Sequence, residues 1–376
     1  MSDAVTYQFE YADRLSAVFV GAGGHSYRNI YPSLQYVPVD LRAVCDQQAD
    51  RAGTYARMFG AAASYTDHRE MLERERPTVA FIVTGYHDDG RVQATEIAAD
   101  CLRAGVHVWM EKPTAASVAE VEMLADLSAT TGRYVMTGLK KIFAPAMEKL
   151  HSIVHSPEFG RPTSISVRYP QALPAPEQRR DLNAMRGFLD HIYHPAAILH
   201  YLMGPVAEMG FQWEPISGAS VAMLRFASGA VGTLHLAAGI GPASPLERVE
   251  VIGDGANAVL DNGVKLTYYR RGSHGEYGRT GSFLVDDAAA PLHWEPEFSL
   301  GQLSNKNLFY LGYVPELQHF CDAVRDGRPP EKGTLADSLA IMRLFDAYRR
   351  VSTGESNSLP LDVTQAANRA PGESNE

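Results

Sequence analysis

The sequence predicts a two-domain α/β protein, in which a doubly wound parallel sheet is followed by an α/β domain with a large, open and mainly antiparallel sheet. Up to about residue 138, short apolar runs alternate with segments of helical spacing, which is the pattern of βαβ units. Beyond residue 145, strand patterns follow one another between turn signals that contain Gly or Asn. The length of 376 residues is that of two ordinary domains.

The first domain is expected at residues 15–138, after an N-terminal extension at 1–14. Strands of a parallel sheet are covered on both faces, so they consist of continuous apolar runs. Such runs occur at 15–20, 41–45, 79–83, 106–110 and 134–137. Helical spacing is found between them, at 48–59, 67–75, 91–104 and 118–130. The alternation predicts helices on both faces of the sheet.

The second domain is expected at residues 139–351, and it begins with a helix at 145–155, a strand at 163–169 and a strong helix at 185–203. Strand patterns then predict an antiparallel meander at 206–213, 220–226, 230–237, 247–252, 256–260 and 265–269. Amphipathic helices at 314–325 and 335–351 are expected to cover this sheet. The segment 268–283 is expected either to cover an active site or to be disordered, and the tail at 352–376 to be loose.

Composition and charge exclude several classes of protein. The net charge of −10 argues against nucleic acid or an anionic membrane as a partner. No apolar stretch approaches the roughly 18 residues of a membrane span, and residues 1–14 lack the apolar run of a signal peptide. Cys45, Cys101 and Cys321 lie in predicted core segments without zinc-site spacing, which favours reduced thiols and no metal. We therefore expect a cytoplasmic protein.

A glycine turn follows the first predicted strand. Gly21 and Gly23 let the chain turn tightly and let backbone amides approach a pyrophosphate, and the small Ser26 still permits close packing of a helix on the strand. Asp46 ends the second strand, where a carboxylate accepts hydrogen bonds from ribose hydroxyls and repels a ribose phosphate. Two glutamines follow it, with no adjacent arginine, which favours NAD over NADP. The other interpretation of Asp46 is a helix N-cap.

Glu111-Lys112-Pro113 follows another predicted buried strand. Ligands of open α/β sheets bind outside the carboxyl ends of the strands, so the Lys112 ammonium is expected to meet cofactor and substrate there. An isolated Lys-Pro pair would more simply lie in an exposed loop. Asp190 and His194, however, lie four residues apart on a predicted helix, so their side chains share one face. A histidine is suited to accept a hydroxyl proton near neutral pH.

These motifs resemble the glucose-fructose oxidoreductase, inositol dehydrogenase and rhizopine catabolism (Gfo/Idh/MocA) family, from about residue 15 to residue 351. The most specific part is the pairing of the Glu-Lys-Pro tripeptide with the Asp-x-x-x-His helix. The other matching segments are Gly21-Ala22-Gly23, Asp46, Ala104-Gly105-Val106-His107-Val108, Ser228-Gly229-Ala230 and Val251-Ile252-Gly253-Asp254-Gly255. The resemblance implies a Rossmann domain that binds NAD, oxidation or reduction of a sugar or cyclitol hydroxyl, and a homodimer or homotetramer formed through the second sheet.

The resemblance also implies that Lys112, Asp190 and His194 are catalytic. His194 would take the hydroxyl proton as hydride leaves the carbon, while Lys112 would stabilise alkoxide character on the same oxygen. Asp190 would either orient His194 or bind a neighbouring substrate hydroxyl, and the sequence leaves both roles open. Contacts to the cofactor are expected from Gly21, Gly23, His25, Ser26, Asp46, Thr84, Tyr86, His87, Glu111 and Lys112.

Departures from the family pattern bear on the substrate. Ala197 stands where many members carry an aspartate, and His191 stands where an aliphatic residue is usual. Cationic residues gather on either side of the predicted cleft, and their side chains suit an anionic sugar or acidic glycoside. The other interpretation is a solvated basic loop. The expected substrate-binding residues are Lys140, Lys141, Arg179, Arg180, Arg186 and His191.

Three functions remain open from the sequence. An NAD-dependent dehydrogenase would oxidise a hydroxyl of a sugar, glycoside or cyclitol once and release the product. An NAD-dependent glycosidase would oxidise the sugar, eliminate the aglycone, add water and return the hydride, and it needs a further base such as His191 or Lys140. A non-catalytic NAD-binding regulator would not need the proton-transfer residues Lys112, Asp190 and His194, so their presence argues against that function.

Overall fold

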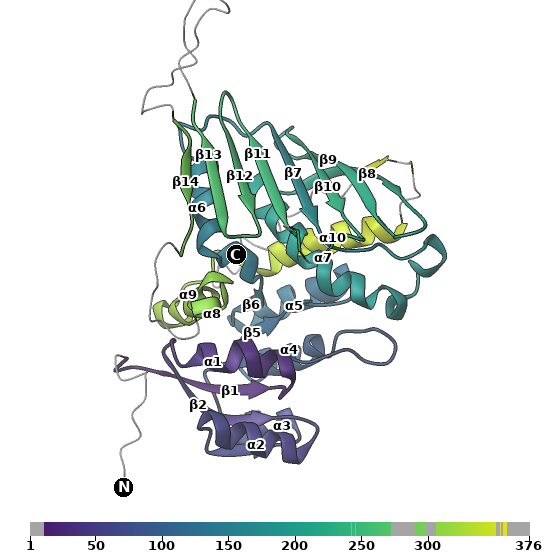
Figure 1. Ribbon diagram of the computed structural model, residues 1–376. Helices are drawn as coiled ribbons and strands as arrows, with labels where there is room; N and C mark the ends of the chain where they lie inside the picture. The colour runs from purple at the N-terminus through teal and green to yellow at the C-terminus, as the bar shows by residue number, and fades with distance from the viewer. Residues whose placement is uncertain are drawn as a thin grey trace, which may run out of the picture.

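The computed structural model describes residues 11–241, 243–244, 246–271, 290–297, 306–350, 354 and 356–358. Within them the chain forms a smaller sheet in the N-terminal half and a larger sheet in the C-terminal half (Figure 1). Helices α7 (Leu182–Met203) and α10 (Leu335–Arg350) run beneath the large sheet, on the side that faces the first domain (Figure 1). The predicted fold class is confirmed. Most of the expected 268–283 insertion, the first ten residues of the extension and nearly all of the tail lie outside the described residues.

The smaller sheet is parallel, as predicted. Its order places β1 and β4 side by side at the point where the strand order reverses, which is where open α/β sheets bind ligands. Strand β3 was not predicted, because it is a short, half-buried edge strand without an apolar run. In spatial order the strands are β3 (Ala63–Tyr65), β2 (Val39–Cys45), β1 (Leu15–Val20), β4 (Val79–Ile82), β5 (His107–Glu111) and β6 (Val135–Gly138).

The helices of the first domain fall where helical spacing predicts them. After the glycine turn, a π-helical turn at Ser26–Ile30 leads into the short α1 (Tyr31–Leu34). The others begin after extended residues, and the Ser117 hydroxyl caps α5 by accepting from the Glu120 amide. They are α2 (Ala49–Phe59), α3 (His68–Glu75), α4 (Gln93–Arg103) and α5 (Val118–Thr131).

The larger sheet contains nine strands within the described residues and is mainly antiparallel. The prediction of a continuous meander is wrong in one respect, because β7 inserts between β10 and β11 and pairs with β10 in parallel. Alternation of apolar and polar residues predicts which face of a strand is buried, but it does not predict the neighbouring strand. The order is β14 (Leu292–Trp294), β13 (Lys265–Tyr269), β12 (Asn257–Asp261), β11 (Arg248–Ile252), β7 (Ser164–Tyr169), β10 (Val231–Leu236), β9 (Ser220–Phe226), β8 (Val206–Trp213) and β15 (Ser356–Ser358).

The late helices take different positions from those expected. α10 packs on α7 and reaches the large sheet, where Tyr348 lies 5.1 Å from the Phe211 ring of β8. α9 (Tyr313–Asp326), which follows the short α8 (Lys306–Tyr310), instead covers the parallel sheet, with Phe320 6.0 Å from Phe81 of β4. The prediction that both helices cover the large sheet is therefore wrong for α9. α6 (Pro145–Val154) lies against β12 and β13. Among the described residues, no helix has the length and apolarity needed to cross a membrane.

Candidate active site

The glycine turn after β1 is shaped for close approach of a ligand. Gly21 has φ +109°, and a Cβ at this position would lie 1.9 Å from the Val83 carbonyl oxygen, so only glycine fits. A Cβ at Gly23 would meet nothing within 4 Å, so the space beside its Cα is open to a ligand. Ser26 is completely buried and closes the turn, because its hydroxyl accepts from the Gly23 amide at 3.0 Å and donates to the Gly23 carbonyl at 2.8 Å.

Asp46 connects the end of the second strand to the glycine turn by a hydrogen bond of its carboxylate. One carboxylate oxygen accepts from the Ala22 amide at 2.9 Å, and the other accepts from the Gln48 amide at 3.0 Å. Gln48, not Asp46, occupies the N-cap position of α2, so the N-cap interpretation does not hold. Each carboxylate oxygen has a second lone pair, so both can still accept from ribose hydroxyls.

A cavity of about 510 Å³ opens beside these residues. The Thr84 hydroxyl, which also belongs to this lining, is buried and has no hydrogen-bond partner within the described residues. The fold also brings Arg51 and Arg69 to the cavity, although no arginine follows Asp46 directly; Arg69 is paired with Asp100. An open glycine backbone, a carboxylate and an orphaned hydroxyl fit a nicotinamide dinucleotide. The sequence-predicted residues in the lining are Gly21, Gly23, Asp46 and Thr84.

Replacement of Asp46 by alanine is expected to weaken NAD and to improve the relative binding of NADP. The variant loses hydrogen bonds to a charged acceptor, each worth about 1.5–3 kcal/mol, or roughly a tenfold to hundredfold rise in the NAD dissociation constant. It also loses the repulsion of a ribose phosphate and leaves Arg51 in the cavity. Titration of both cofactors checks this, with Asp40→Ala as the control because Asp40 is an exposed residue of the same strand. Unchanged cofactor preference would refute the ribose role.

Glu111 connects the glycine turn to the loop that carries Lys112. Its side chain is 8% exposed, and its two oxygens bind His25 Nε2 at 2.9 Å and the Lys112 amide at 2.9 Å. His25 comes from the loop that precedes the π-helical turn, so the carboxylate fixes β5 relative to the cofactor side of the domain. Of the other predicted cofactor contacts, His87 lies beside Glu96 of α4, with 3.7 Å between Nε2 and Oε2.

Lys112, Asp190 and Tyr86 meet where β5 ends against α7. Lys112 Nζ lies 3.0 Å from Asp190 Oδ1, and the Tyr86 hydroxyl donates to the same oxygen at 3.2 Å. Lys112 is 13% exposed, whereas Asp190 is 33% exposed, so the pair is shielded yet open on one side. Burial and the nearby Asp190 raise the pKa of Tyr86, which keeps its hydroxyl protonated. Tyr86, predicted as a cofactor contact, therefore belongs to this cluster.

His194 lies one turn after Asp190 on α7, and its side chain forms no hydrogen bond or ion pair within the described residues. Its ring centroid is 6.1 Å from that of Tyr169. Burial and then the positive charges of Lys112, Lys141 and Lys140 lower the pKa of His194 well below its ordinary value. The imidazole is therefore neutral near pH 7 and can accept a proton. Asp190 contacts Lys112 and Tyr86, which is a third arrangement beside the two roles left open for it. These contacts do not support orientation of His194, and binding of a substrate hydroxyl stays a prediction.

The predicted substrate-binding cations are only partly brought together. Lys141 is paired with Glu247 at 2.6 Å, and Lys140 donates to the Tyr313 hydroxyl at 2.7 Å. Burial, followed by the charge of Lys141, lowers the pKa of Lys140 to about 8. These two residues begin a 3-10 turn (Lys140–Phe143) directly after the parallel sheet.

The arginines and His191 differ in their placement. Arg179 is 3% exposed and lies over the Phe211 and Trp213 rings, so its guanidinium is held by aromatic side chains of β8 instead of Lys112 or Asp190. Arg180 is exposed. Arg186 is exposed one turn before Asp190 and lies 5.8 Å from the Tyr86 ring. His191 is exposed, its Nδ1 donates to the Gly187 carbonyl at 2.9 Å, and the same nitrogen lies 3.7 Å from Asp190 Oδ2.

Several residues of this site carry no signal in the amino-acid sequence. Tyr169 ends β7 and Glu247 immediately precedes β11, so the two meet only because these strands are neighbours in the large sheet. Glu316 on α9 is completely buried without a hydrogen-bond partner among the described residues, and burial followed by the charge of Glu111 raises its pKa well above the ordinary value. No local pattern marks these positions. The described residues contain no cluster of three or more acidic, His or Cys side chains able to hold a metal.

Matches to protein-family models test the family membership that the sequence motifs suggest. Residues 15–139 match the model of an oxidoreductase family with an NAD-binding Rossmann fold, and residues 147–259 match the GFO/IDH/MocA C-terminal domain. Together the matches cover more than half of the chain. The chain belongs to the Gfo/Idh/MocA family. It is thus an oxidoreductase whose first domain binds NAD, and the cavity beside Gly23 and Asp46 fits that cofactor.

Individual members of the Gfo/Idh/MocA family are similar over nearly the whole chain. A myo-inositol 2-dehydrogenase of Thermotoga maritima is 23% identical over 335 residues, which are 86% of this chain and 91% of the relative. An oxidoreductase of Agrobacterium radiobacter, solved with NAD⁺, L-tartaric acid and magnesium, has a TM-score of 0.74 at 15% identity and covers 92% of this chain and 98% of its own. A levoglucosan dehydrogenase solved with NADH and levoglucosan has a TM-score of 0.74 at 17% identity, over 93% and 100% of the two chains. These structural likenesses show the shared fold.

Proposed function

We propose that the protein is an NAD-dependent dehydrogenase that oxidises a hydroxyl of a sugar, glycoside or cyclitol. The observation that carries the proposal is the approach of Lys112 Nζ to Asp190 Oδ1 at 3.0 Å, beside a neutral His194 and at the carboxyl end of β5. An ammonium donor and a proton acceptor beside the carboxyl end of β5 support this proposal, because open α/β sheets bind their ligands at that edge. The relatives that act on myo-inositol and levoglucosan support a polyhydroxylated ring as substrate.

Each residue of the cluster has a distinct task in this reaction. Bound NAD⁺ would supply the acceptor for the hydride of the carbon that bears the hydroxyl group. His194 accepts the hydroxyl proton, because its imidazole is neutral. Lys112 holds the same oxygen and stabilises the negative charge that develops on it, while Asp190 holds the Lys112 ammonium in place. The products are a ketone, NADH and one proton.

We propose that Arg186 is the residue that binds an acidic substituent of the substrate. Lys112 and Lys141 are neutralised by Asp190 and Glu247, so they offer less positive charge to a substrate than the sequence indicates. Arg186 is exposed and lies on the catalytic helix beside Tyr86. A guanidinium there suits a carboxylate or sulfate on the ring.

A second candidate, redox-neutral cleavage of a glycoside, is favoured by Lys140. That reaction needs a base to remove the proton next to the newly formed carbonyl, after which the aglycone leaves, water adds and hydride returns to the sugar. A pKa of about 8 leaves a fraction of the Lys140 amine neutral near physiological pH and therefore able to accept a proton. Lys140 follows β6, the strand beside β5.

Incubation of the purified protein and NAD⁺ with a panel of neutral and anionic glycosides and cyclitols distinguishes these functions. We expect accumulation of NADH, which identifies a dehydrogenase. Release of the aglycone without net NADH would identify the glycosidase. Neither signal from any member of the panel, with NAD still bound, would contradict both and favour a regulator. Equal turnover of matched neutral and anionic substrates would contradict the proposed contact between Arg186 and an acidic substituent.

We also propose that the large sheet mediates self-association into a homodimer or homotetramer. Exposed apolar side chains extend across neighbouring strands of its outer face. Light scattering after size exclusion checks this, and replacement of Met223, which is 72% exposed, by lysine is expected to yield a smaller species. An unchanged mass would contradict the role of this face. The apolar side chains concerned are Val221, Met223, Val231 and Ile252.

A further inference from the structure

Thr114 lies two residues after Lys112 and is completely buried. Other elements bind all three of its polar groups. Its amide donates to the Tyr193 hydroxyl oxygen at 3.2 Å, and its carbonyl accepts from the Thr95 hydroxyl at 2.8 Å. Its own hydroxyl donates to Ser338 Oγ at 2.9 Å. The segment that carries Lys112 is therefore held by α7, α4 and α10 together.

The Thr114 hydroxyl belongs to a buried ring of three hydroxyls, formed with Thr137 of β6 and Ser338 of α10. The oxygen distances are 2.8 Å from Thr114 to Thr137, 2.9 Å from Thr114 to Ser338 and 2.9 Å from Thr137 to Ser338. All three side chains have zero exposure. Each hydroxyl has one proton, so a ring in which Thr114 donates to Ser338 is complete when Ser338 donates to Thr137 and Thr137 to Thr114. Removal of one member leaves buried polar atoms unpaired.

Tyr193 extends this arrangement to the catalytic helix. It directly precedes His194, its side chain is completely buried, and its oxygen accepts the Thr114 amide. Burial raises the pKa of Tyr193 to about 12, so the hydroxyl is neutral near pH 7. The loop of Lys112 and the turn of α7 that carries His194 are thus joined by a buried hydrogen bond.

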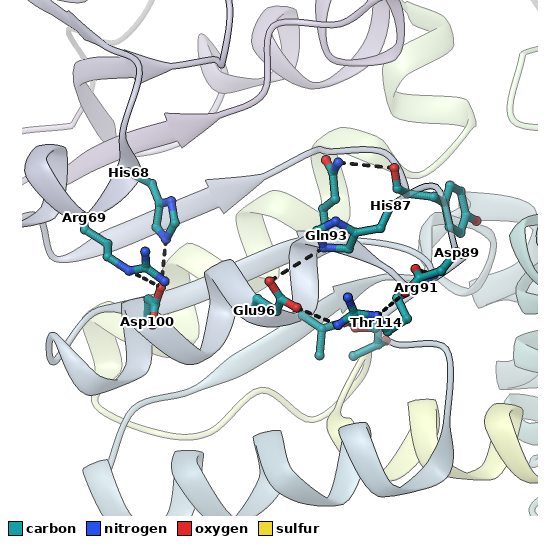
Figure 2. A network of polar contacts seen from close by, with 11 residues as sticks. His68, Arg69, His87, Asp89, Arg91, Gln93, Glu96, Asp100 and Thr114 are labelled. Atoms are coloured by element: carbon teal, nitrogen blue, oxygen red, sulfur yellow. Dashed lines mark hydrogen bonds and ion pairs between the residues drawn. The ribbon is translucent and has the colours of Figure 1, made fainter. Parts of the chain in front are cut away.

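The N-terminal end of α4 holds the loops that carry Tyr86 and Lys112, which both bind Asp190. Gln93 donates to the Tyr86 carbonyl at 3.2 Å, and Thr95 donates to the Thr114 carbonyl (Figure 2). One helix end therefore fixes the loop of Tyr86 and the loop of Lys112. Figure 2 shows that the other end of α4 is anchored as well, because Asp100 binds His68 and Arg69 at 2.9 Å each.

We propose that Thr114 is a positioning residue, which acts with Tyr193 to hold the Lys112 ammonium against Asp190 and the substrate oxygen beside His194. This assignment rests on the proposed dehydrogenase function. A lysine side chain has four rotatable methylene units, so its reach is defined only if its backbone is fixed. Displacement of a catalytic group by about 1 Å costs on the order of 100-fold in rate, which makes the fixed backbone a requirement for turnover.

The test compares Thr114→Val with Thr114→Ser and Thr137→Val. Valine keeps the shape of threonine and removes the hydroxyl, whereas serine keeps the hydroxyl. Both valine variants break the ring of hydroxyls, but only Thr114→Val changes the segment attached to Lys112. We expect Thr114→Val to lower kcat about tenfold or more, with the NAD dissociation constant unchanged, and Thr114→Ser to restore it. Thr137→Val is expected to lose a similar amount of thermal stability but clearly less kcat.

A readout independent of turnover is the rate at which Lys112 is acetylated by trace acetic anhydride, measured by peptide mass spectrometry. We expect Thr114→Val and Tyr193→Phe to raise this rate, because the ammonium leaves Asp190, while acetylation of the exposed Lys149 stays constant. Equal losses of kcat in the two valine variants, or an unchanged Lys112 rate, would overturn the positioning role. If the wild type oxidises none of the panel substrates, the proposed function fails, and the acetylation rates still decide whether Thr114 positions Lys112.

Discussion

Replacement of Lys112 by methionine is expected to lower kcat by about 1,000-fold while leaving NAD affinity close to that of the wild type. One preorganised donor to a developing oxyanion contributes about 10²–10³ in kcat, and Lys112 also fixes Asp190. Methionine keeps the length and the apolar stem of lysine but removes its charge. Stopped-flow measurement of NADH formation with saturating substrate and cofactor gives kcat directly.

Lys149→Met is the matched control, because Lys149 is an exposed lysine on α6. It is expected to retain wild-type turnover. Addition of small amines to Lys112→Met should restore part of the rate if the missing ammonium is the cause. Wild-type turnover in Lys112→Met would show that the cluster at the end of β5 is not the catalytic site.

Replacement of His194 by asparagine is expected to lower kcat roughly 10²- to 10⁴-fold, the range for loss of a general base. Asparagine preserves hydrogen-bonding capacity and approximate volume but does not accept the proton. NAD affinity should be unaffected. His155→Asn serves as the control, because His155 is exposed at the end of α6, where its side chain contacts only His151 among the described residues. Normal turnover in His194→Asn would make another group the base.

The pH dependence of His194 gives this prediction a second measurement. Burial and the neighbouring lysines lower the pKa of His194 below the ordinary 6.5, so it remains neutral and competent until the pH falls well below that value. We expect kcat/KM to have no acid limb between pH 6.5 and 7.5. Because the folded-state pKa is depressed, the stability linked to a neutral His194 is present above pH 6.5 and is lost as the pH falls. Thermal unfolding of His194→Asn should therefore depend less on pH on the acid side.

Much of the first domain could be predicted because strands covered on both faces are continuous apolar runs. Leu15–Val20 and Val79–Ile82 show this clearly. The strand Ala63–Tyr65 was not predicted, because a half-buried edge strand of this length has too few residues for a periodic pattern. The insertion of Ser164–Tyr169 between strands from later in the chain, and the packing of Tyr313–Asp326 on the parallel sheet, are set by tertiary contacts that local patterns do not contain.

The residues of the candidate site also fall into two groups, those with a local signal in the sequence and those without one. Gly21 and Lys112 could be predicted because backbone geometry and a strand end leave local signals in the sequence. Glu247, which neutralises Lys141, and Tyr313, which binds Lys140, come from distant segments without such a signal. The sequence therefore predicted more positive charge for binding a substrate than these contacts leave available. Arg179 shows the same limit, since its guanidinium is buried against aromatic rings.

The assignment of the Lys112 cluster as the site of hydride transfer to NAD is tested most directly with a substrate that carries deuterium on the carbon of the reacting hydroxyl. In a single turnover with excess enzyme and NAD⁺, we expect the recovered NADH to carry one deuterium, and Lys112→Met to form almost none in the same time. Deuterium that stays in the sugar while NADH forms, or equal transfer by Lys112→Met, would contradict the assignment.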